Sequence, residues 1–130
     1  MDAAKRELID KWKEKAEHDF VTASVVATQL PNYKDIVGFH CQQCAEKYIK
    51  SVLVFYDLPF SRTHDLEFLL DILQNATIVF PLEVRNVAIY LTDYAVEVRY
   101  PSGRIDVSAI DVQETIVQAE KIKKWAETIV

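Results

Sequence analysis

The 130-residue sequence predicts an all-α protein, an up-and-down antiparallel four-helix bundle with one additional short helix. Three observations lead to this prediction. Only two glycines and four prolines punctuate the chain, and they separate long segments in which apolar residues recur every three or four positions. No segment shows the strict apolar and polar alternation of a half-buried strand. The connections between segments are brief, and short loops favour antiparallel neighbours.

The composition indicates one domain that spans residues 1–130. Half of the residues are hydrophobic, which is enough for one core. The formal net charge of -5 weighs against a general affinity for nucleic-acid backbones, although it allows a small local basic site. No apolar run approaches the roughly 18 residues of a membrane-spanning helix, and no apolar signal segment begins the chain. Together with two cysteines that have no evident partners, this predicts a cytoplasmic protein.

The first two helices are delimited by prolines. The first is predicted over about residues 4–29 and ends before Pro31, because a residue that precedes proline avoids the helical region. The second is predicted over about residues 35–56 and ends before Pro59. The apolar residues expected to face the core from the first helix are Leu8, Trp12, Ala16, Phe20, Ala23 and Ala27.

A short third helix is predicted after this break. Thr63 is expected to cap it, and Asp65 and Glu67 suit the positive end of its dipole. Its expected core face consists of Leu66, Leu69, Leu70 and Leu73.

The fourth and fifth helices are predicted on either side of a loop that contains Pro101 and Gly103. The fourth covers about residues 81–99, because Pro81 is tolerated in a first helical turn. The fifth begins around Ser108, where Asp111 helps to cap it.

Within the second helix, residues 39–50 read FHCQQCAEKYIK and place a Cys-x-x-Cys beside a histidine. On a helix, Cys41 and Cys44 share the apolar face, since residues three and four apart lie together. Zinc needs about four ligands, and a thioredoxin-like motif needs a strand before its first cysteine. We therefore predict two buried structural thiols, with no metal and no cofactor; metal or redox chemistry is the alternative.

The opposite side of this helix is predicted to be a solvated polar stripe formed by Gln43, Glu46, Lys47 and Lys50. Glu46 and Lys50 form an i,i+4 pair in the favourable order, worth about 0.2–0.5 kcal/mol, which explains them without a ligand. His64 is expected to help organise the start of the third helix. His18 and His40 have no acid or nucleophile at a readable spacing, so we assign them surface or packing roles.

Four local features follow one another along the chain: Trp12 with Ala16 and Asp19, the segment FHCQQCAEKYIK, Thr63-His64-Asp65-Leu66, and Arg99-Tyr100-Pro101. Their order resembles that of the HEPN domains, a family named for higher eukaryotes, prokaryotes and nucleotide binding. The second feature is similar to the family's aromatic-x-x-Gln-Gln-x-x-Glu-Lys-x-x-Lys helix, and the third to its Thr-His-Asp-Leu helix start. The resemblance covers nearly the whole chain.

This resemblance implies a helical bundle that often forms a homodimer and is frequently encoded beside a minimal nucleotidyltransferase, as in toxin-antitoxin pairs. Bundles of this kind also resemble the substrate-binding portion of aminoglycoside nucleotidyltransferases. Many other members are metal-independent ribonucleases, in which an arginine is followed four to six residues later by a histidine. Here the residues after Arg99 read Tyr-Pro-Ser-Gly-Arg-Ile-Asp and include no histidine.

Without that histidine, we assign no catalytic residue. Metal-free cleavage beside a 2′-hydroxyl needs a group that accepts and returns a proton near neutral pH, whereas arginine stays protonated. Arg99 can still bind a phosphate and Tyr100 can stack on a base. The predicted ligand-binding residues are Arg99, Tyr100, Lys47, Lys50, Gln43, Glu46 and His64.

The sequence therefore favours a non-catalytic module that binds a nucleotide or another phosphate-containing ligand, or that partners a minimal nucleotidyltransferase, as a homodimer. RNA is a further candidate ligand, and no membrane association is expected. One alternative is a metal-independent ribonuclease that uses Arg99 without the usual histidine. Another is a structural interaction bundle whose polar stripe docks a partner helix.

Overall fold

The computed structural model describes residues 1–93 and 110–130. Over these residues the chain forms helices and no strand, which confirms the all-α prediction. The helices are α1 (Ala3–Gln29), α2 (Lys34–Phe55), α3 (Leu66–Asn75), α4 (Leu82–Leu91) and α5 (Val112–Glu127).

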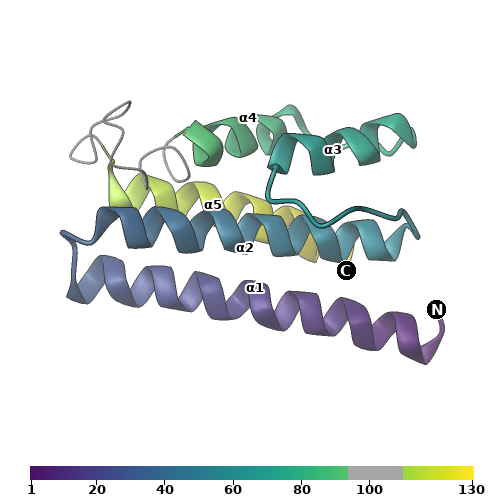
Figure 1. Cartoon of the computed structure of the whole chain (residues 1–130), viewed down its shortest axis with the longest axis horizontal. Helices are drawn as coiled ribbons and strands as arrows, with labels where there is room; N and C mark the ends of the chain where they lie inside the picture. Colours follow the sequence, from purple (N-terminus) through teal and green to yellow (C-terminus); the bar gives the residue numbers. More distant parts are fainter. Residues whose placement is uncertain (94–109) are drawn as a thin grey trace.

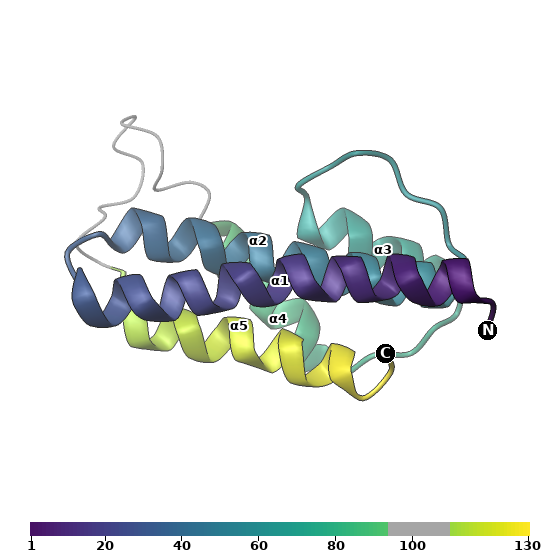
Figure 2. The ribbon, with the colours of Figure 1, turned by 90° about the horizontal axis from the view of Figure 1, so that it is seen from below.

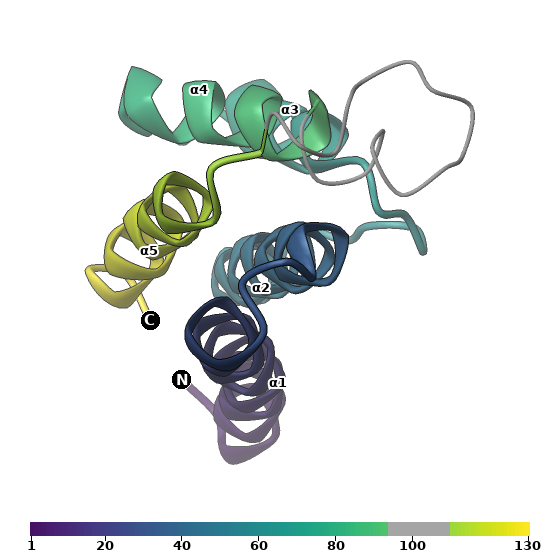
Figure 3. The same cartoon turned by 90° about the vertical axis from the view of Figure 1, so that its left-hand side faces the viewer.

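The helices form two layers. The long helices α1, α2 and α5 lie side by side along the long axis of the molecule (Figures 1 and 2). The short helices α3 and α4 cover α2 and α5 and are inclined to them (Figure 3). When the short α3 is set aside, the directions of α1, α2, α4 and α5 alternate along the chain (Figure 1). The predicted up-and-down arrangement with one additional short helix is therefore confirmed.

The observed helix ends agree with the predicted breaks at the prolines. α1 is capped by the side chain of Asp2, which accepts a hydrogen bond from the backbone N–H of Lys5 at 2.7 Å. α4 lies within the predicted range 81–99, of which residues 94–99 are outside the described residues. No helix in the described part of the chain is both long and apolar enough to cross a membrane.

One predicted cap and one predicted helix start need correction. Asp65, rather than Thr63, caps α3 and accepts from the N–H of Phe68 at 3.1 Å, while the Thr63 hydroxyl accepts from the N–H of Asp65. Asp111 caps α5 as predicted, but the helix begins at Val112 rather than around Ser108. Ser108 itself lies outside the described residues. In both helices the aspartate nearest the first apolar turn is the cap, because its short carboxylate reaches the unpaired N–H groups.

The core face of α1 also differs from the prediction. Leu8 is 46% exposed, whereas its neighbour Ile9 is fully buried together with Ala16 and Ala23. A stripe that advances by four residues rotates about 40° per step around a helix, so a spacing of four drifts off the core face, while a spacing of seven stays on it. α1 therefore packs on α2 through Ala16, Ala23 and Ala27, and Trp12 and Phe20 are only partly buried.

Helix α2 is the central helix of the molecule. It contacts every other helix (Figure 3), and its buried residues cover most of its circumference, leaving one strip with Gln43 and Lys47 that is only partly buried. They include Cys41, Cys44, Tyr48, Ile49 and Leu53, but also four polar residues, Gln42, Glu46, Lys50 and Ser51. A helix in this position has no fully solvated side, and this decides the environment of the candidate site.

Candidate functional site

Two of the four residues in the predicted polar stripe of α2 are buried. Glu46 is 3% exposed and Lys50 is 5% exposed, and their side chains form an ion pair in which Nζ lies 3.0 Å from Oε2. Two aromatic rings cover this pair, because the Lys50 Nζ lies 5.3 Å from the ring centre of Trp12 and 5.7 Å from that of Phe60. Trp12 belongs to α1, and Phe60 to the segment 56–65, which folds back from the end of α2 toward α3 (Figure 2). The prediction of a solvated stripe was therefore wrong for Glu46 and Lys50, whereas Gln43 and Lys47 are only partly buried.

His64 joins this pair from the segment that precedes α3. Its Nδ1 lies 2.7 Å from Oε1 of Glu46, so both carboxylate oxygens of Glu46 have a partner. An ionised carboxylate only accepts hydrogen bonds, so Nδ1 carries the proton and donates. The His64 side chain is nevertheless 72% exposed. One nitrogen is thus held by a buried anion, while the Nε2 edge remains available to a ligand.

Two glutamines of α2 extend the network. The side chain of Gln42 donates to the backbone carbonyl of His64 at 2.8 Å, and that of Gln43 donates to Oε1 of Gln42 at 2.9 Å. His64 thus attaches the segment before α3 to α2 through both its ring and its backbone carbonyl, whereas the cap of α3 itself is Asp65. Among the predicted ligand-binding residues, Gln43, Glu46, Lys50 and His64 lie in one network.

Lys47 takes part in a different cluster. Its Nζ lies 2.5 Å from Oδ2 of Asp19, and the other oxygen of this largely buried carboxylate lies 2.8 Å from Nδ1 of His40. The sequence analysis found no acid partner for His40, because Asp19 lies 21 positions away on α1. This cluster ties α1 to α2 and keeps Lys47 apart from Lys50.

A third polar cluster joins α1, α2 and α5. The Tyr48 hydroxyl donates to Glu17 at 2.9 Å, and Lys123 of α5 donates to the same carboxylate at 2.8 Å. The hydrogen bond from Lys123 lowers the pKa of Glu17. Burial, and then the hydrogen bond to Glu17, raise the pKa of Tyr48. Each group is thus held in one protonation state, which suits a structural connection between the three long helices.

The two cysteines are fully buried and form no disulfide. Burial, and secondarily the charge of Asp19, raise the pKa of the Cys41 thiol to about 12. Burial also raises the pKa of Cys44 well above its usual value. The prediction of buried thiols is confirmed, and such thiols are poor nucleophiles. Across residues 1–93 and 110–130, no cluster of three or more His, Cys, Asp or Glu side chains is placed to hold a metal ion.

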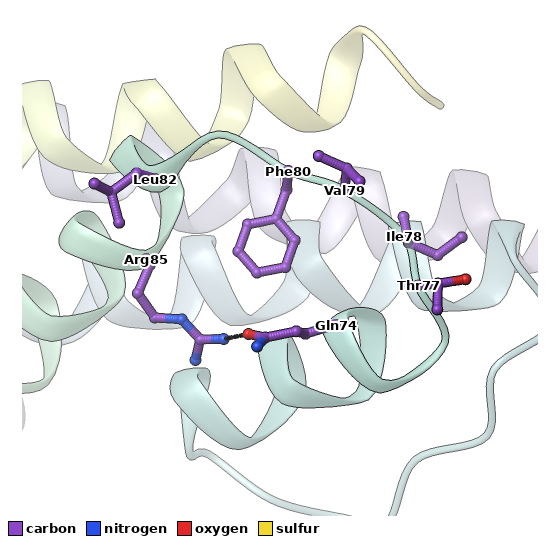
Figure 4. Close-up of a pocket in the computed structure, with 7 residues that line it drawn as sticks. All are labelled: Gln74, Thr77, Ile78, Val79, Phe80, Leu82 and Arg85. Carbon is purple, nitrogen blue, oxygen red and sulfur yellow. Dashed lines mark hydrogen bonds between the residues drawn. The ribbon is translucent and has the colours of Figure 1, made fainter.

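A separate hollow of about 430 Å³ lies between α3 and α4. Its cation, Arg85, is already paired within α3, because the guanidinium donates to Gln74 at 2.7 Å (Figure 4). It also donates to Asp71 at 2.9 Å. The rest of the lining is mainly apolar and includes the exposed side chains of Val79 and Leu82. Because the guanidinium of Arg85 is already paired, this hollow is a weaker candidate for binding an anionic ligand than the network around His64.

Two predicted site residues, Arg99 and Tyr100, lie outside the described residues. Three residues of the observed network, Gln42, Trp12 and Phe60, were not among the predicted ligand-binding residues. Gln42 and Trp12 belong to the four ordered sequence features quoted above, and those features could have identified them. No local signal singles out Phe60.

The fold and the features quoted above point to one family, and comparison with known proteins decides it. The sequence profile of the HEPN domain matches residues 9–129. This chain belongs to the HEPN domain family. A similar solved structure is the crystal structure of ST0689, an archaeal HEPN homologue, with a TM-score of 0.72 and 25% sequence identity. That match covers 92% of this chain and 95% of the other. No curated protein matches this HEPN chain.

Proposed function

We propose that this HEPN domain is a non-catalytic module that binds a nucleotide or nucleotide-like ligand, and that it acts as a homodimer and as the partner of a minimal nucleotidyltransferase. The single observation that supports ligand binding best is the exposed ring of His64, held by the buried carboxylate of Glu46. The nucleotidyltransferase and the homodimer enter the proposal through what the HEPN resemblance implies.

The arrangement of Glu46 and Lys50 favours a binding role over a purely structural one. A buried ion pair gains little over apolar residues of similar volume, because both charges lose their hydration. Here the pair also orients His64, since Glu46 contacts Lys50 and His64 at the same time. A group that is already fixed loses less conformational freedom when a ligand binds. The Nε2 edge can donate to a phosphate when the ring is charged and accept from a base when it is neutral.

Neither alternative gains support from the described contacts. The ribonuclease depends on Arg99, which lies outside the described residues. The interaction bundle was to dock a partner helix through the polar stripe of α2, but Glu46 and Lys50 of that stripe are buried and are not a surface.

The binding role can be tested with ATP as the probe. We expect His64→Ala to weaken ATP binding about tenfold, because a hydrogen bond to a charged group contributes roughly 1.5–3 kcal/mol. Isothermal titration calorimetry measures the change, and thermal unfolding shows whether the variant is folded. His18→Ala is a matched control, since the His18 side chain is also 72% exposed and also faces a glutamate. Absence of ATP binding by the unmodified protein, or an equal loss in both variants, would contradict the proposal.

The partner role has its own test. A purified minimal nucleotidyltransferase is expected to co-elute with this chain in size-exclusion chromatography and to change its affinity for ATP. If the two proteins elute separately and the affinity for ATP stays the same, the partner part of the proposal is wrong, whatever the outcome with His64→Ala.

A further inference from the structure

Trp12 stands between two hollows on the outside of α1 and of the segment that follows α2. A hollow of about 160 Å³ is lined by Leu8, Lys11, Trp12 and Lys15. A broader one of about 670 Å³ shares Leu8 and Trp12 and extends to Phe60. The partly exposed Trp12 thus lines both hollows, and two lysines line the smaller one.

The ring of Trp12 is fixed from the interior. Phe60 packs against it edge to face, with 6.2 Å between the ring centres and an angle of 61° between the ring planes. The buried cation of Lys50 lies 5.3 Å from the centre of the same ring, a contact in which the cation is attracted to the ring's electron density. Since Lys50 pairs with Glu46, and Glu46 holds His64, Trp12 belongs to the same connected network as the proposed site.

The lysines beside Trp12 are exposed and lie one helical turn apart. Lys11 contacts Glu7 at 3.4 Å, and both side chains of this pair are mainly exposed. Exposed pairs of this kind contribute little, so Lys11 can exchange Glu7 for a phosphate at small cost. Lys15 lines the same hollow. The combination of an aromatic face with neighbouring cations is the one by which proteins bind the bases and phosphates of single-stranded nucleic acids without sequence preference.

We propose that Trp12 stacks on the base of a bound nucleotide in the 160 Å³ hollow, and that Lys11 and Lys15 contact its phosphates. This inference rests on the proposed function and names the part of the surface that receives the base. The surface of the hollow is apolar, with Lys11 and Lys15 contributing their alkyl stems, which suits the face of a base, and its small size favours a single ring system over a docked helix. Both lysines are exposed side chains at the edge of this hollow, so their ammonium groups favour an anionic ligand over an uncharged one.

Fluorescence locates the base directly. The chain has two tryptophans, and in a Trp125→Phe background Trp12 is the sole tryptophan, which excitation at the long-wavelength edge of its absorption selects over the six tyrosines. ATP is expected to quench this emission, whereas inorganic tripolyphosphate, which carries no base, is expected to quench it much less. If calorimetry shows ATP binding to this protein while Trp12 emission stays constant, the stacking inference is wrong and the proposed function stands.

Substitutions give an independent test. Trp12→Leu is expected to weaken ATP binding about tenfold, since stacking on one aromatic ring contributes roughly 1–3 kcal/mol. Trp125→Leu is its control, because Trp125 also makes an edge contact with a phenylalanine at 6.2 Å. The double variant Lys11→Ala with Lys15→Ala leaves the core untouched and is expected to weaken ATP binding several-fold. Lys121→Ala with Lys124→Ala on α5 is the control for this double variant, because it removes the same number of positive charges away from the hollow.

The outcomes separate the two proposals. Unchanged affinity in both the Trp12 and the lysine variants, with His64→Ala weakened, overturns the stacking site and leaves the proposed function in place. Absence of ATP binding by the unmodified protein overturns both. A Trp12 emission that responds to a purified nucleotidyltransferase but not to ATP identifies a protein-docking surface, and the stacking inference is then wrong.

Discussion

Replacing Glu46 with methionine is expected to lower the free energy of unfolding by about 3–5 kcal/mol, because it leaves a buried charge without its partner. Among the described residues, the contacts that remain for the ammonium group of Lys50 are those with the rings of Trp12 and Phe60. Ring contacts attract a cation, but they do not replace the hydrogen bond that Glu46 accepts from it at 3.0 Å. Urea unfolding, followed by circular dichroism, measures the loss.

A second variant distinguishes the effect of leaving the charge of Lys50 unpaired from the effect of altered packing around residue 46. Glu46→Met combined with Lys50→Met removes both buried charges, and we expect it to recover most of the stability, since apolar residues of similar volume can replace a buried pair. The exposed pair Glu120 and Lys124 is a matched control. It has the same order, the same spacing and an N···O distance of 2.8 Å, but its side chains are 41% and 73% exposed, compared with 3% and 6% for Glu46 and Lys50.

Glu120→Met is expected to leave stability nearly unchanged, because solvent already screens that pair. If Glu46→Met is tolerated equally well, Glu46 and Lys50 are hydrated in solution. The orientation of His64 by a buried carboxylate would then lose its basis, and with it the observation that best supports ligand binding.

The contrast between these two ion pairs, which have the same spacing but different burial, shows which features of the structure the sequence predicts. The helix limits near Pro31 and Pro59 were predictable, since proline acts on its immediate neighbours. Caps are also local, yet Thr63 and Asp65 compete for one helix start, and only the observed contact with Phe68 decides between them. Local rules thus give helices and leave their ends uncertain by a few residues.

Burial of the polar residues could not be predicted from α2 alone. Glu46 and Lys50 have the spacing of an ordinary exposed pair, and their environment depends on Trp12 and Phe60, which come from other parts of the chain. His64 lies 18 positions from Glu46, and no periodicity connects them. The ordered HEPN features did include both residues. The family pattern therefore included both residues of this tertiary contact, which helical periodicity could not predict.

The thiols of Cys41 and Cys44 are expected to react with a disulfide reagent only when the protein opens. At pH 8 a thiol whose pKa is about 12, as for Cys41, has about three orders of magnitude less thiolate than an ordinary cysteine with a pKa near 8.5. Burial of both side chains adds a barrier to access. The native protein should therefore react at least about a thousandfold more slowly than the same protein in urea.

This reaction also connects the cysteines to Glu46. When opening is fast and reversible, the rate of labelling follows the population of the open state, which is set by the free energy of unfolding. Glu46→Met should then accelerate labelling by the factor that corresponds to its loss of stability, while Glu120→Met should not. Rapid labelling of either thiol in the stable native protein, with no acceleration in Glu46→Met, would instead reveal an accessible thiolate. In that case the Cys-x-x-Cys of α2 would have a chemical role that its burial argues against.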